Sequence, residues 1–429
     1  MKNLLIICDN FPPQSGPRMG YLVKYAKRLG WNSYVVAAEN KSRNDLTGLS
    51  GYAVETHVVP QRRHRKWNLL HILPFFWPYD YLRGEYEIRR IASEIVQRVK
   101  IDLVLCTHTY GWFPLSAAYA VAKKANIPLI VDIRDLVEQN PKIPFFEMSF
   151  NQKMDFLRDK CSFLSNRRAV RMHRDAAALT SISPWHAEWL KRWNRNSFCI
   201  YNGFDPELFK PIEPVKSNQF EIVYAGSLAT KRQRNPELLL EAIVQLDRSG
   251  VISPEMFTLN FYGEPSGSHV LPAARALGIE RYLKFFPSVP ITNLPEIFAK
   301  ASVLLLLGAR PSDFRTHGVM TTKFYEYFAS RRPILLVPDD EECLGQVIRE
   351  SGAGWAVRTV EDTVSCLTTL LEQWKATGVV SGNTMDGDRY DLFSRETQAS
   401  QFVEIFDKIL NGTMVPGQIF NGTDKIEGD

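Results

Sequence analysis

Short apolar runs alternate with segments of helical periodicity along nearly the whole chain. Leu4–Cys8 is a continuous apolar run closed by Asp9, and Pro17–Leu29 then repeats apolar residues at helical spacing before Gly30. A continuous apolar run predicts a strand buried on both faces, and the periodic segment predicts a helix that covers it. Further apolar runs of the first 200 residues are Tyr34–Ala38, Leu103–Cys106, Leu129–Val131 and Ala178–Ile182.

The same alternation begins again after Asn202 and Gly203. The polar, Pro-containing segment 213–220 is typical of a linker between domains, and Ile222–Tyr224 opens a second series of apolar runs. The sequence therefore predicts two doubly wound, Rossmann-like α/β domains in tandem, each built on a parallel sheet. The later runs of the second series are Leu259–Tyr262, Leu283–Phe286, Val303–Leu307 and Ile334–Val337.

We predict four parts of the chain from this pattern. Residues 1–200 form the N-terminal domain and residues 201–390 the C-terminal domain. Residues 391–412 contain an amphipathic helix, because apolar residues recur on one face of it. Residues 413–429 are polar and Gly-rich, which predicts a disordered tail. The apolar face of the helix consists of Phe402, Ile405, Phe406 and Ile409.

Composition excludes several classes of protein. With 45% hydrophobic and 23% charged residues among 429, the chain is neither disordered nor collagen-like nor a coiled coil. No apolar run approaches the roughly 18–20 residues of a membrane span. The apolar start is too short for a signal peptide because Asp9 interrupts it, so we expect a cytoplasmic protein. Six scattered cysteines contain no metal-binding spacing, and no metal is expected.

Charge is distributed unevenly along the chain. Residues 1–200 contain 30 Lys and Arg against 17 Asp and Glu, whereas the remainder contains 22 against 30. A basic half fits either a solvated face or an anionic partner, and without a nucleic-acid-binding motif we favour anionic lipid over nucleic acid. The basic, aromatic region 61–90 in particular fits the inner surface of a membrane. Its residues are Arg62, Arg63, Arg65, Lys66, Trp67, Phe75, Phe76, Trp77, Tyr79 and Tyr81; a second basic cluster is Arg158, Lys160, Arg167, Arg168, Arg171 and Arg174.

Two loops of the N-terminal domain carry candidate chemistry, because ligands of open parallel sheets bind beyond the carboxyl ends of the strands. Gly16 precedes a predicted helix, where a glycine lets backbone amides approach an anion; an ordinary turn is the alternative. Charged residues also crowd the end of Leu129–Val131, either as a binding site or as an internal ion pair. The candidates beside Gly16 are Arg18, His108, Asp132, Arg134 and Asp135.

Two loops of the C-terminal domain contain the remaining candidate residues. The loop after Ile222–Tyr224 contains cations that would neutralise a diphosphate leaving group, unless they are merely solvated. The second loop opens a helix whose N-terminal amides would hold phosphate, while Glu326 accepts hydrogen bonds from a ribose diol; a Glu that only favours the helix dipole is the alternative. The candidates are Gly226, Lys231, Arg232 and Arg234 in the first loop and Thr321, Thr322, Lys323 and Glu326 in the second.

These segments together resemble the family 4 glycosyltransferases, which have the GT-B fold. The resemblance covers nearly the whole chain and implies two Rossmann-like domains facing across a cleft, with the C-terminal helix packing back on the first domain. The segments, in the order of the family, are FPPQSGPRMGYLVKYAKRLGW, IPLIVDIRDLVEQ, YNGFDPELF, YAGSLATKRQRNPELLLEAI and TTKFYEYFASRRPILL.

The resemblance also implies roles for the candidates. Arg232, Arg234 and His108 would be catalytic, the remaining C-terminal candidates and Gly16 would bind the donor, and the remaining N-terminal candidates would face the acceptor. The family motif has two Glu with seven residues between them; Glu326 matches the second, but the first falls on Gly318. In many members the first Glu contacts the donor sugar, so Asp313 or His317 would have to compensate, or the contact is lacking. Two further departures are Ser227, where Arg is common, and Gly16-Pro17 in place of Gly-Gly.

The function implied is retaining transfer of a sugar from a nucleotide sugar to a saccharide acceptor, without a metal cofactor. The basic N-terminal face adds the expectation of a lipid-linked acceptor in polysaccharide, capsule or O-antigen assembly, on a protein peripheral to the cytoplasmic membrane. Two alternatives stay open: a nucleotide-sugar epimerase on the same fold, and a non-catalytic subunit that binds nucleotide sugars.

Overall fold

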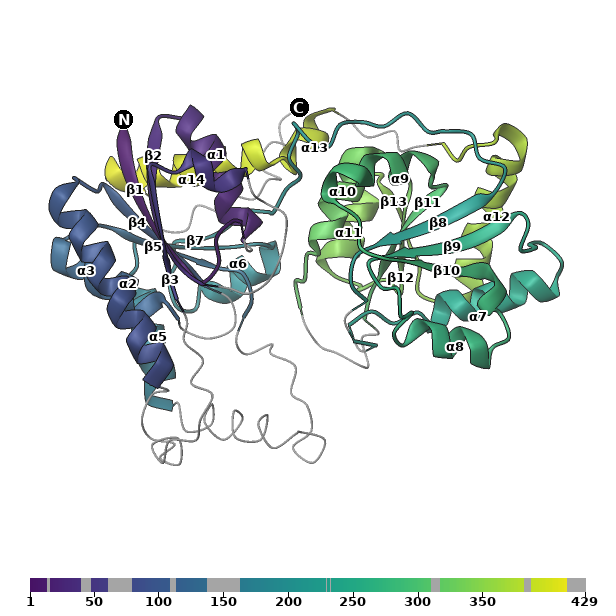
Figure 1. Ribbon diagram of the computed structural model, residues 1–429, viewed down its shortest axis with the longest axis horizontal. Helices are drawn as coiled ribbons and strands as arrows, with labels where there is room; N and C mark the ends of the chain where they lie inside the picture. Colours follow the sequence, from purple (N-terminus) through teal and green to yellow (C-terminus); the bar gives the residue numbers. More distant parts are fainter. Residues whose placement is uncertain are drawn as a thin grey trace. The chain divides into compact units, whose positions relative to one another are not determined.

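The computed structural model places most of the chain in two units (Figure 1). One unit contains Met1–Tyr201 with Arg395–Asp429, and the other contains Asn202–Ser394. The predicted fold class is confirmed, since each unit is an α/β fold on one parallel sheet. The structure describes residues 1–13, 16–39, 48–60, 79–108, 113–136, 163–228, 230–231, 233–309, 317–381 and 387–414.

The first unit is built on a seven-stranded sheet in the order β3-β2-β1-β4-β5-β6-β7. All pairings are parallel, and the chain direction across the sheet reverses between β1 and β4. That reversal is the switch point at which doubly wound sheets bind ligands. The strands are β1 (Lys2–Cys8), β2 (Trp31–Ala38), β3 (Glu55–Val59), β4 (Leu103–His108), β5 (Leu129–Ile133), β6 (Ala178–Ser181) and β7 (Ser197–Cys199).

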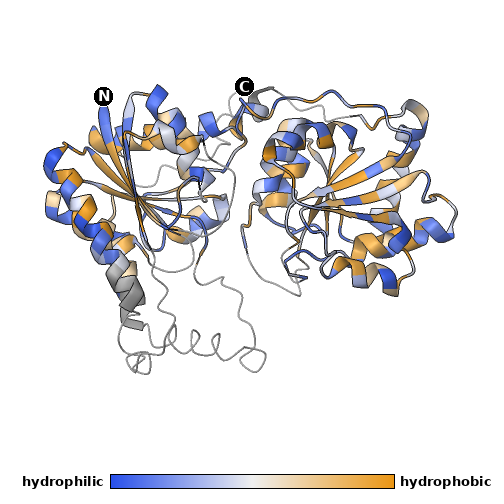
Figure 2. Cartoon of the chain, viewed as in Figure 1, coloured by the Kyte–Doolittle hydropathy of each residue, from blue (hydrophilic) through white to orange (hydrophobic). Residues whose placement is uncertain are grey.

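Successive residues of β1 serve opposite faces of this sheet, as the strand period of two requires. Leu4 and Ile6 join the core under α1 and α14, whereas Leu5 and Ile7 join the core under α2, α3 and α5. The strands are therefore apolar along most of their length, as Figure 2 shows. The helices are α1 (Pro17–Arg28), η1 (Leu49–Tyr52), α2 (Tyr79–Arg98), α3 (Leu115–Ala125), α5 (Phe163–Asp175), α6 (Pro184–Leu190) and α14 (Arg395–Leu410).

The helix expected near the C-terminus lies in the first unit. α14 packs on α1 (Figure 1), and its Phe406 ring lies 5.1 Å from the Trp31 ring. The second unit ends at Ser394, so the segment predicted as 391–412 is divided between the units. The predicted tail lies outside the described residues from position 415 onwards.

The second unit has a six-stranded sheet in the order β10-β9-β8-β11-β12-β13, again parallel throughout. Its switch point lies between β8 and β11. The strands are β8 (Phe220–Ala225), β9 (Phe257–Tyr262), β10 (Leu283–Phe286), β11 (Val303–Leu307), β12 (Ile334–Val337) and β13 (Gly354–Ala356).

The helices of the second unit bury apolar residues on both faces of its sheet. One core gathers side chains of α7, α8 and α12, while α9 and α10 contact β8 and β11. No helix among the described residues of either unit is both long and apolar enough to cross a membrane. The helices are α7 (Glu237–Arg248), α8 (Val270–Ala276), η4 (Glu280–Tyr282), η5 (Ile291–Asn293), α9 (Leu294–Lys300), α10 (Thr322–Ser330), α11 (Cys343–Glu350), α12 (Val360–Thr377) and α13 (Gly387–Leu392).

Candidate functional site

The carboxyl end of β8 meets a lysine of α10. Gly226 follows β8 with a φ of 122°, and a Cβ at this position would lie 2.4 Å from Lys323 Cε. The backbone conformation therefore favours glycine, and a side chain at this position would displace the end of the Lys323 side chain. The Lys323 ammonium also lies 5.2 Å from the centre of the Tyr224 ring. Two of the loops that the sequence singled out are thus in contact.

Lys323 is a cation in an unfavourable environment. Its pKa is lowered from 10.5 to about 8, chiefly by burial and then by the charge of Arg234, while Glu326 acts in the opposite direction. Burial raises the pKa of the Tyr224 hydroxyl, while the charge of Arg234 and a hydrogen bond with it act in the opposite direction. Two cations crowded at the mouth of a sheet create a positive potential that an anion would relieve.

The N-terminus of α10 lies at the same place. Thr321 precedes the helix with an extended backbone, and the first N–H groups of a helix have no partner within it. The helix is anchored to β8, because the buried Tyr327 hydroxyl accepts a hydrogen bond from the Ala225 N–H at 2.8 Å. Glu326 lies one turn into the helix and is half-buried. The helix dipole therefore adds to the positive potential made by the two cations.

The rest of the loop after β8 is fixed to its neighbours. The Asn235 N–H donates to the Gly308 carbonyl at 2.9 Å, which connects the loop to the end of β11. The Arg234 carbonyl contacts His269 Nε2 at 2.8 Å. Lys231 is exposed and forms an ion pair with Glu237 of α7, so it does not join the Lys323 cluster. Arg232 lies outside the described residues.

Gly318 stands where the two-Glu motif would have its first Glu. It contacts Glu342, an acidic residue from another loop. Its φ is 70°, and its N–H donates to Glu342 Oε2 at 2.8 Å. His317 Nδ1 contacts the other oxygen of the same carboxylate. Of the two residues expected to compensate at this position, His317 therefore binds Glu342, and Asp313 lies outside the described residues.

In the first unit, Gly16 is held by its own loop. It has a φ of 83° at the start of α1, and a Cβ there would lie 2.4 Å from the Asn10 carbonyl oxygen. A side chain cannot be accommodated without moving the backbone of that loop. The position is compatible with the predicted approach of an anion to the N-terminus of α1.

Arg18 and Asp132 form a buried ion pair in the same unit. Arg18 Nε and Nη2 donate to the two carboxylate oxygens, each at 2.9 Å, and both residues are almost fully buried. Thr107 and Thr180 donate to the same carboxylate at 3.2 and 2.7 Å. Burial opposes ionisation of Asp132, but the charge and hydrogen bonds of Arg18 outweigh it, so the net effect is a lowered pKa. The pair also lies against Phe402 of α14, whose ring centre is 5.1 Å from the guanidinium.

The remaining candidates of the first unit lie at the ends of β4 and β5. Arg134 pairs with Asp9 at 2.7 Å, and burial raises the pKa of Asp135 against the influence of Arg134. His108 is fully buried and stacks on His173 with ring centres 5.7 Å apart. Of the charged residues at this edge, Arg134 is therefore paired with Asp9.

The sequence of the first unit is similar to a known protein family. Residues 18–208 match the family model Glycosyltransferase Family 4. This part of the chain is similar to the glycosyltransferases of family 4. The resemblance to family 4 glycosyltransferases that the sequence motifs indicated is thereby confirmed. No curated protein matches the sequence.

Solved structures establish the fold of the whole chain. A glycosyltransferase from Rickettsia africae matches with a TM-score of 0.61 at 13% identity, covering 95% of this chain and 98% of its own. Sucrose-phosphate synthase from Thermosynechococcus elongatus matches with a TM-score of 0.60 at 13% identity, covering 96% and 100%. A lipopolysaccharide outer core galactosyltransferase matches with a TM-score of 0.56 at 12% identity, with the same coverage. At these identities the likeness is one of fold, the GT-B arrangement of two parallel-sheet domains.

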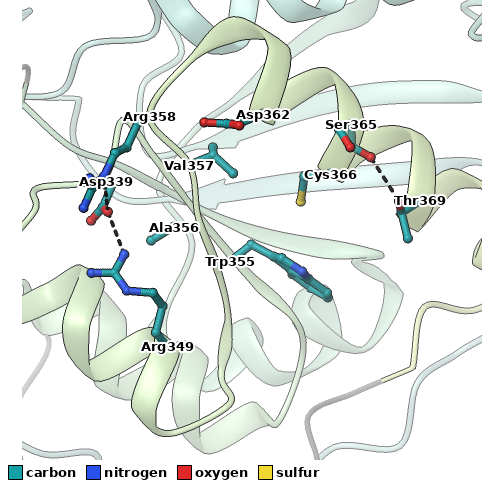
Figure 3. A pocket seen from close by; sticks show the side chains of 10 residues that line it. All are labelled: Asp339, Arg349, Trp355, Ala356, Val357, Arg358, Asp362, Ser365, Cys366 and Thr369. Atoms are coloured by element: carbon teal, nitrogen blue, oxygen red, sulfur yellow. Dashed lines mark hydrogen bonds and ion pairs between the residues drawn. The ribbon is translucent and has the colours of Figure 1, made fainter.

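A cavity of about 620 Å³ in the second unit lies away from the predicted donor residues. Figure 3 shows it beside β13, with Arg349 and Arg358 reaching Asp339 from two sides. Their bonds to Asp339 Oδ2 are 2.6 and 3.2 Å long. Because its lining holds two guanidinium groups and two carboxylates, those of Asp339 and Asp362, the cavity offers little net charge to an anion. None of the predicted donor residues lines it.

Three residues of the candidate site could not be found from the sequence. Tyr224 and Tyr327 read as core aromatics of a strand and a helix, and nothing in their spacing shows their hydroxyl contacts. Glu342 stands in a run of four acids, Asp339–Glu342, that reads as a solvated loop. Among the described residues, no group of His, Cys, Asp or Glu has the arrangement of a metal site.

Proposed function

We propose that this family 4 glycosyltransferase binds a nucleotide-sugar donor on its second unit and transfers the sugar to a saccharide acceptor with retention of configuration. One observation carries the proposal: Lys323 and Arg234 are crowded together at the N-terminus of α10, beside a glycine that leaves room only for the lysine. A protein gains nothing in stability from two adjacent, partly buried cations. A diphosphate group would neutralise both.

The roles of the site residues follow from this geometry. Arg234 and Lys323 would stabilise the negative charge that develops on the diphosphate as the sugar departs, together with the amides of Thr321 and Thr322. Glu326 would accept hydrogen bonds from the ribose hydroxyls. Gly226 keeps the end of β8 free for Lys323. The roles of Arg232 and Lys231 as further cations, and of Gly16 as a phosphate contact, remain part of the proposal, as does metal-independent catalysis.

The acceptor would bind the basic first unit, near His108, Arg134 and Asp135. Three arginines on α5, at positions 168, 171 and 174, are exposed and spaced about one helical turn apart. Such a stripe supports attraction to an anionic surface, and with it a lipid-linked acceptor used in cell-surface polysaccharide synthesis on the inner face of the membrane. The basic, aromatic residues 62–77 proposed for the same surface, and Arg158 and Lys160, lie outside the described residues.

The donor site can be tested by isothermal titration with UDP, GDP, ADP, dTDP and CMP. We expect one nucleotide to bind, and binding to weaken at least tenfold in Lys323→Met. Lys284→Met is the control, because Lys284 is an exposed lysine on β10 of the same unit. Equal binding by wild type and Lys323→Met would contradict the assignment, and no binding of any nucleotide would contradict the proposed function.

Two alternatives are separated by the reaction that follows binding. An epimerase would convert the donor sugar without an acceptor, whereas a transferase would require one. A putative UDP-N-acetylglucosamine 2-epimerase from Listeria monocytogenes shares the fold with a TM-score of 0.52 at 11% identity. A non-catalytic subunit, suggested by Gly318, would bind the nucleotide sugar and leave it unchanged. Incubation of the donor with and without lipid-linked saccharides distinguishes the three outcomes.

A further inference from the structure

The loop after β12 carries four consecutive acids, and two of them are committed to the fold. Asp339 binds Arg349 and Arg358, as described above. Asp340 accepts N–H groups of the following turn, including those of Leu344 at 3.1 Å and Gly345 at 2.7 Å. Asp340 therefore satisfies the N-terminus of α11, and Glu342 is not needed as its cap.

Glu342 faces a different segment. One carboxylate oxygen accepts the Gly318 N–H and the other contacts His317, both on the segment that leads into α10. The Glu342 side chain is 28% exposed and His317 is 41% exposed. The carboxylate is thus fixed in position by two contacts while part of it still faces solvent. Each carboxylate oxygen has two acceptor positions, so the contacts leave capacity for a ligand.

The backbone at position 318 explains why the carboxylate comes from another loop. With a φ of 70°, this position favours glycine over any residue with a side chain, so an acid at 318 would strain the turn. Glu342, the residue before α11, instead supplies a carboxylate to the same point. Only three residue steps separate Gly318 from Thr321, which is at most about 10 Å of extended chain.

We infer that Glu342 accepts hydrogen bonds from hydroxyl groups of the donor sugar and contributes to the choice of sugar. The inference rests on the proposed function, in which the diphosphate lies at the N-terminus of α10. The sugar is bonded to that diphosphate, so it must lie within a few ångströms of it. An ionised carboxylate makes strong, charge-assisted hydrogen bonds to hydroxyl donors. Glu342 is therefore a specificity-determining residue, with His317 and the Gly318 N–H as the groups that position it.

The test compares binding of nucleotides with and without the sugar. Isothermal titration would use UDP with UDP-glucose, UDP-galactose and UDP-N-acetylglucosamine, and GDP with GDP-mannose. In Glu342→Gln we expect the dissociation constant of the nucleotide sugar to rise about tenfold, while that of the nucleoside diphosphate changes less than twofold. Glu342→Asp keeps the charge on a shorter side chain and should give an intermediate loss.

Glu341→Gln is the matched control, because Glu341 is the neighbouring acid and its side chain lies 3.6 Å from Arg358 instead of at Gly318. It should leave both dissociation constants unchanged. If Glu342→Gln weakens the diphosphate and the nucleotide sugar equally, or weakens neither, the inference is wrong while the proposed donor site stands. If the wild type binds none of these probes, the proposed function and the inference fail together.

Discussion

Two groups of charged residues lie at the carboxyl ends of parallel strands, and they differ in how their charges are compensated. In the first unit, Arg18 meets Asp132 in a two-pronged ion pair, and two threonines complete the carboxylate's hydrogen bonds. In the second unit, Lys323 lies beside another cation, Arg234, and its pKa falls to about 8. The first group is satisfied by the protein itself, whereas the second is improved by an added anion.

The difference shows how to tell a stabilising charged residue from a ligand-binding one at the carboxyl end of a strand. Both groups stand where doubly wound sheets bind ligands, and the sequence alone ranks them alike. A buried ion pair with every oxygen occupied supports the fold, and we assign Arg18 and Asp132 to the stability of the first unit. Like charges held together cost stability and are typical of a binding site. The following predictions test that division.

The largest effect on stability is expected from Arg18→Met. The substitution leaves the Asp132 carboxylate buried without its cation, which costs about 3–5 kcal/mol of unfolding free energy. Urea unfolding followed by circular dichroism would measure the loss. Nucleotide binding, measured at low urea where the variant is still folded, should be unchanged. A variant that keeps its stability, or that loses nucleotide affinity while folded, would reverse the assignment.

Gly226→Ala should disturb the second group by steric conflict. The new Cβ would lie 2.4 Å from Lys323 Cε, and alanine would have to adopt a φ of 122°. We therefore expect a loss of about 1–3 kcal/mol of unfolding free energy and at least tenfold weaker nucleotide binding. Gly250→Ala is the control, since Gly250 has a φ of 69° with no atom within 4 Å of a Cβ. It should lose stability without losing affinity; equal affinity losses in both variants would refute the steric explanation.

Lys323→Met should raise stability while it lowers affinity. Methionine keeps the apolar contact with Gly226 and Tyr224 but removes a partly buried charge whose cost is on the order of 1–3 kcal/mol. The folded pKa of about 8 lies below the unfolded value, so the cost is fully present below pH 8 and disappears as the pH rises towards 10.5. Unfolding of wild type and variant at pH 7 and pH 10 would measure this: the variant's advantage at pH 7 should shrink at pH 10. A less stable variant at pH 7 would contradict it.

Much of the fold follows from the sequence because its central strands are continuous apolar runs. The strands that the pattern did not predict are β3, β7 and β13, which lie at or near sheet edges. β3 is largely half-buried and carries polar residues, while β7 and β13 have only three residues each. A half-buried strand carries a weaker apolar signal, and a strand of three residues is too short to form a recognisable apolar run.

The candidate site is predictable only in part. The Gly226 loop and the start of α10 are both visible in the sequence, and the topology brings them together because β8 and β11 are neighbours. The contacts of Arg18 with Asp132 and of Gly318 with Glu342 join residues far apart in the chain. Such pairings depend on loop paths and side-chain rotamers, which a periodic pattern does not encode.

The central claim is that Lys323 belongs to a diphosphate site, and proton uptake on binding tests it most directly. An anion favours the protonated lysine, so binding should raise its pKa from about 8 towards its ordinary value. Isothermal titration of the selected nucleoside diphosphate at pH 8.5, in two buffers of different ionisation enthalpy, measures the protons taken up. The account predicts a net uptake of roughly half a proton or more per nucleotide bound. Nucleotide binding without proton uptake would show that the phosphates lie away from Lys323.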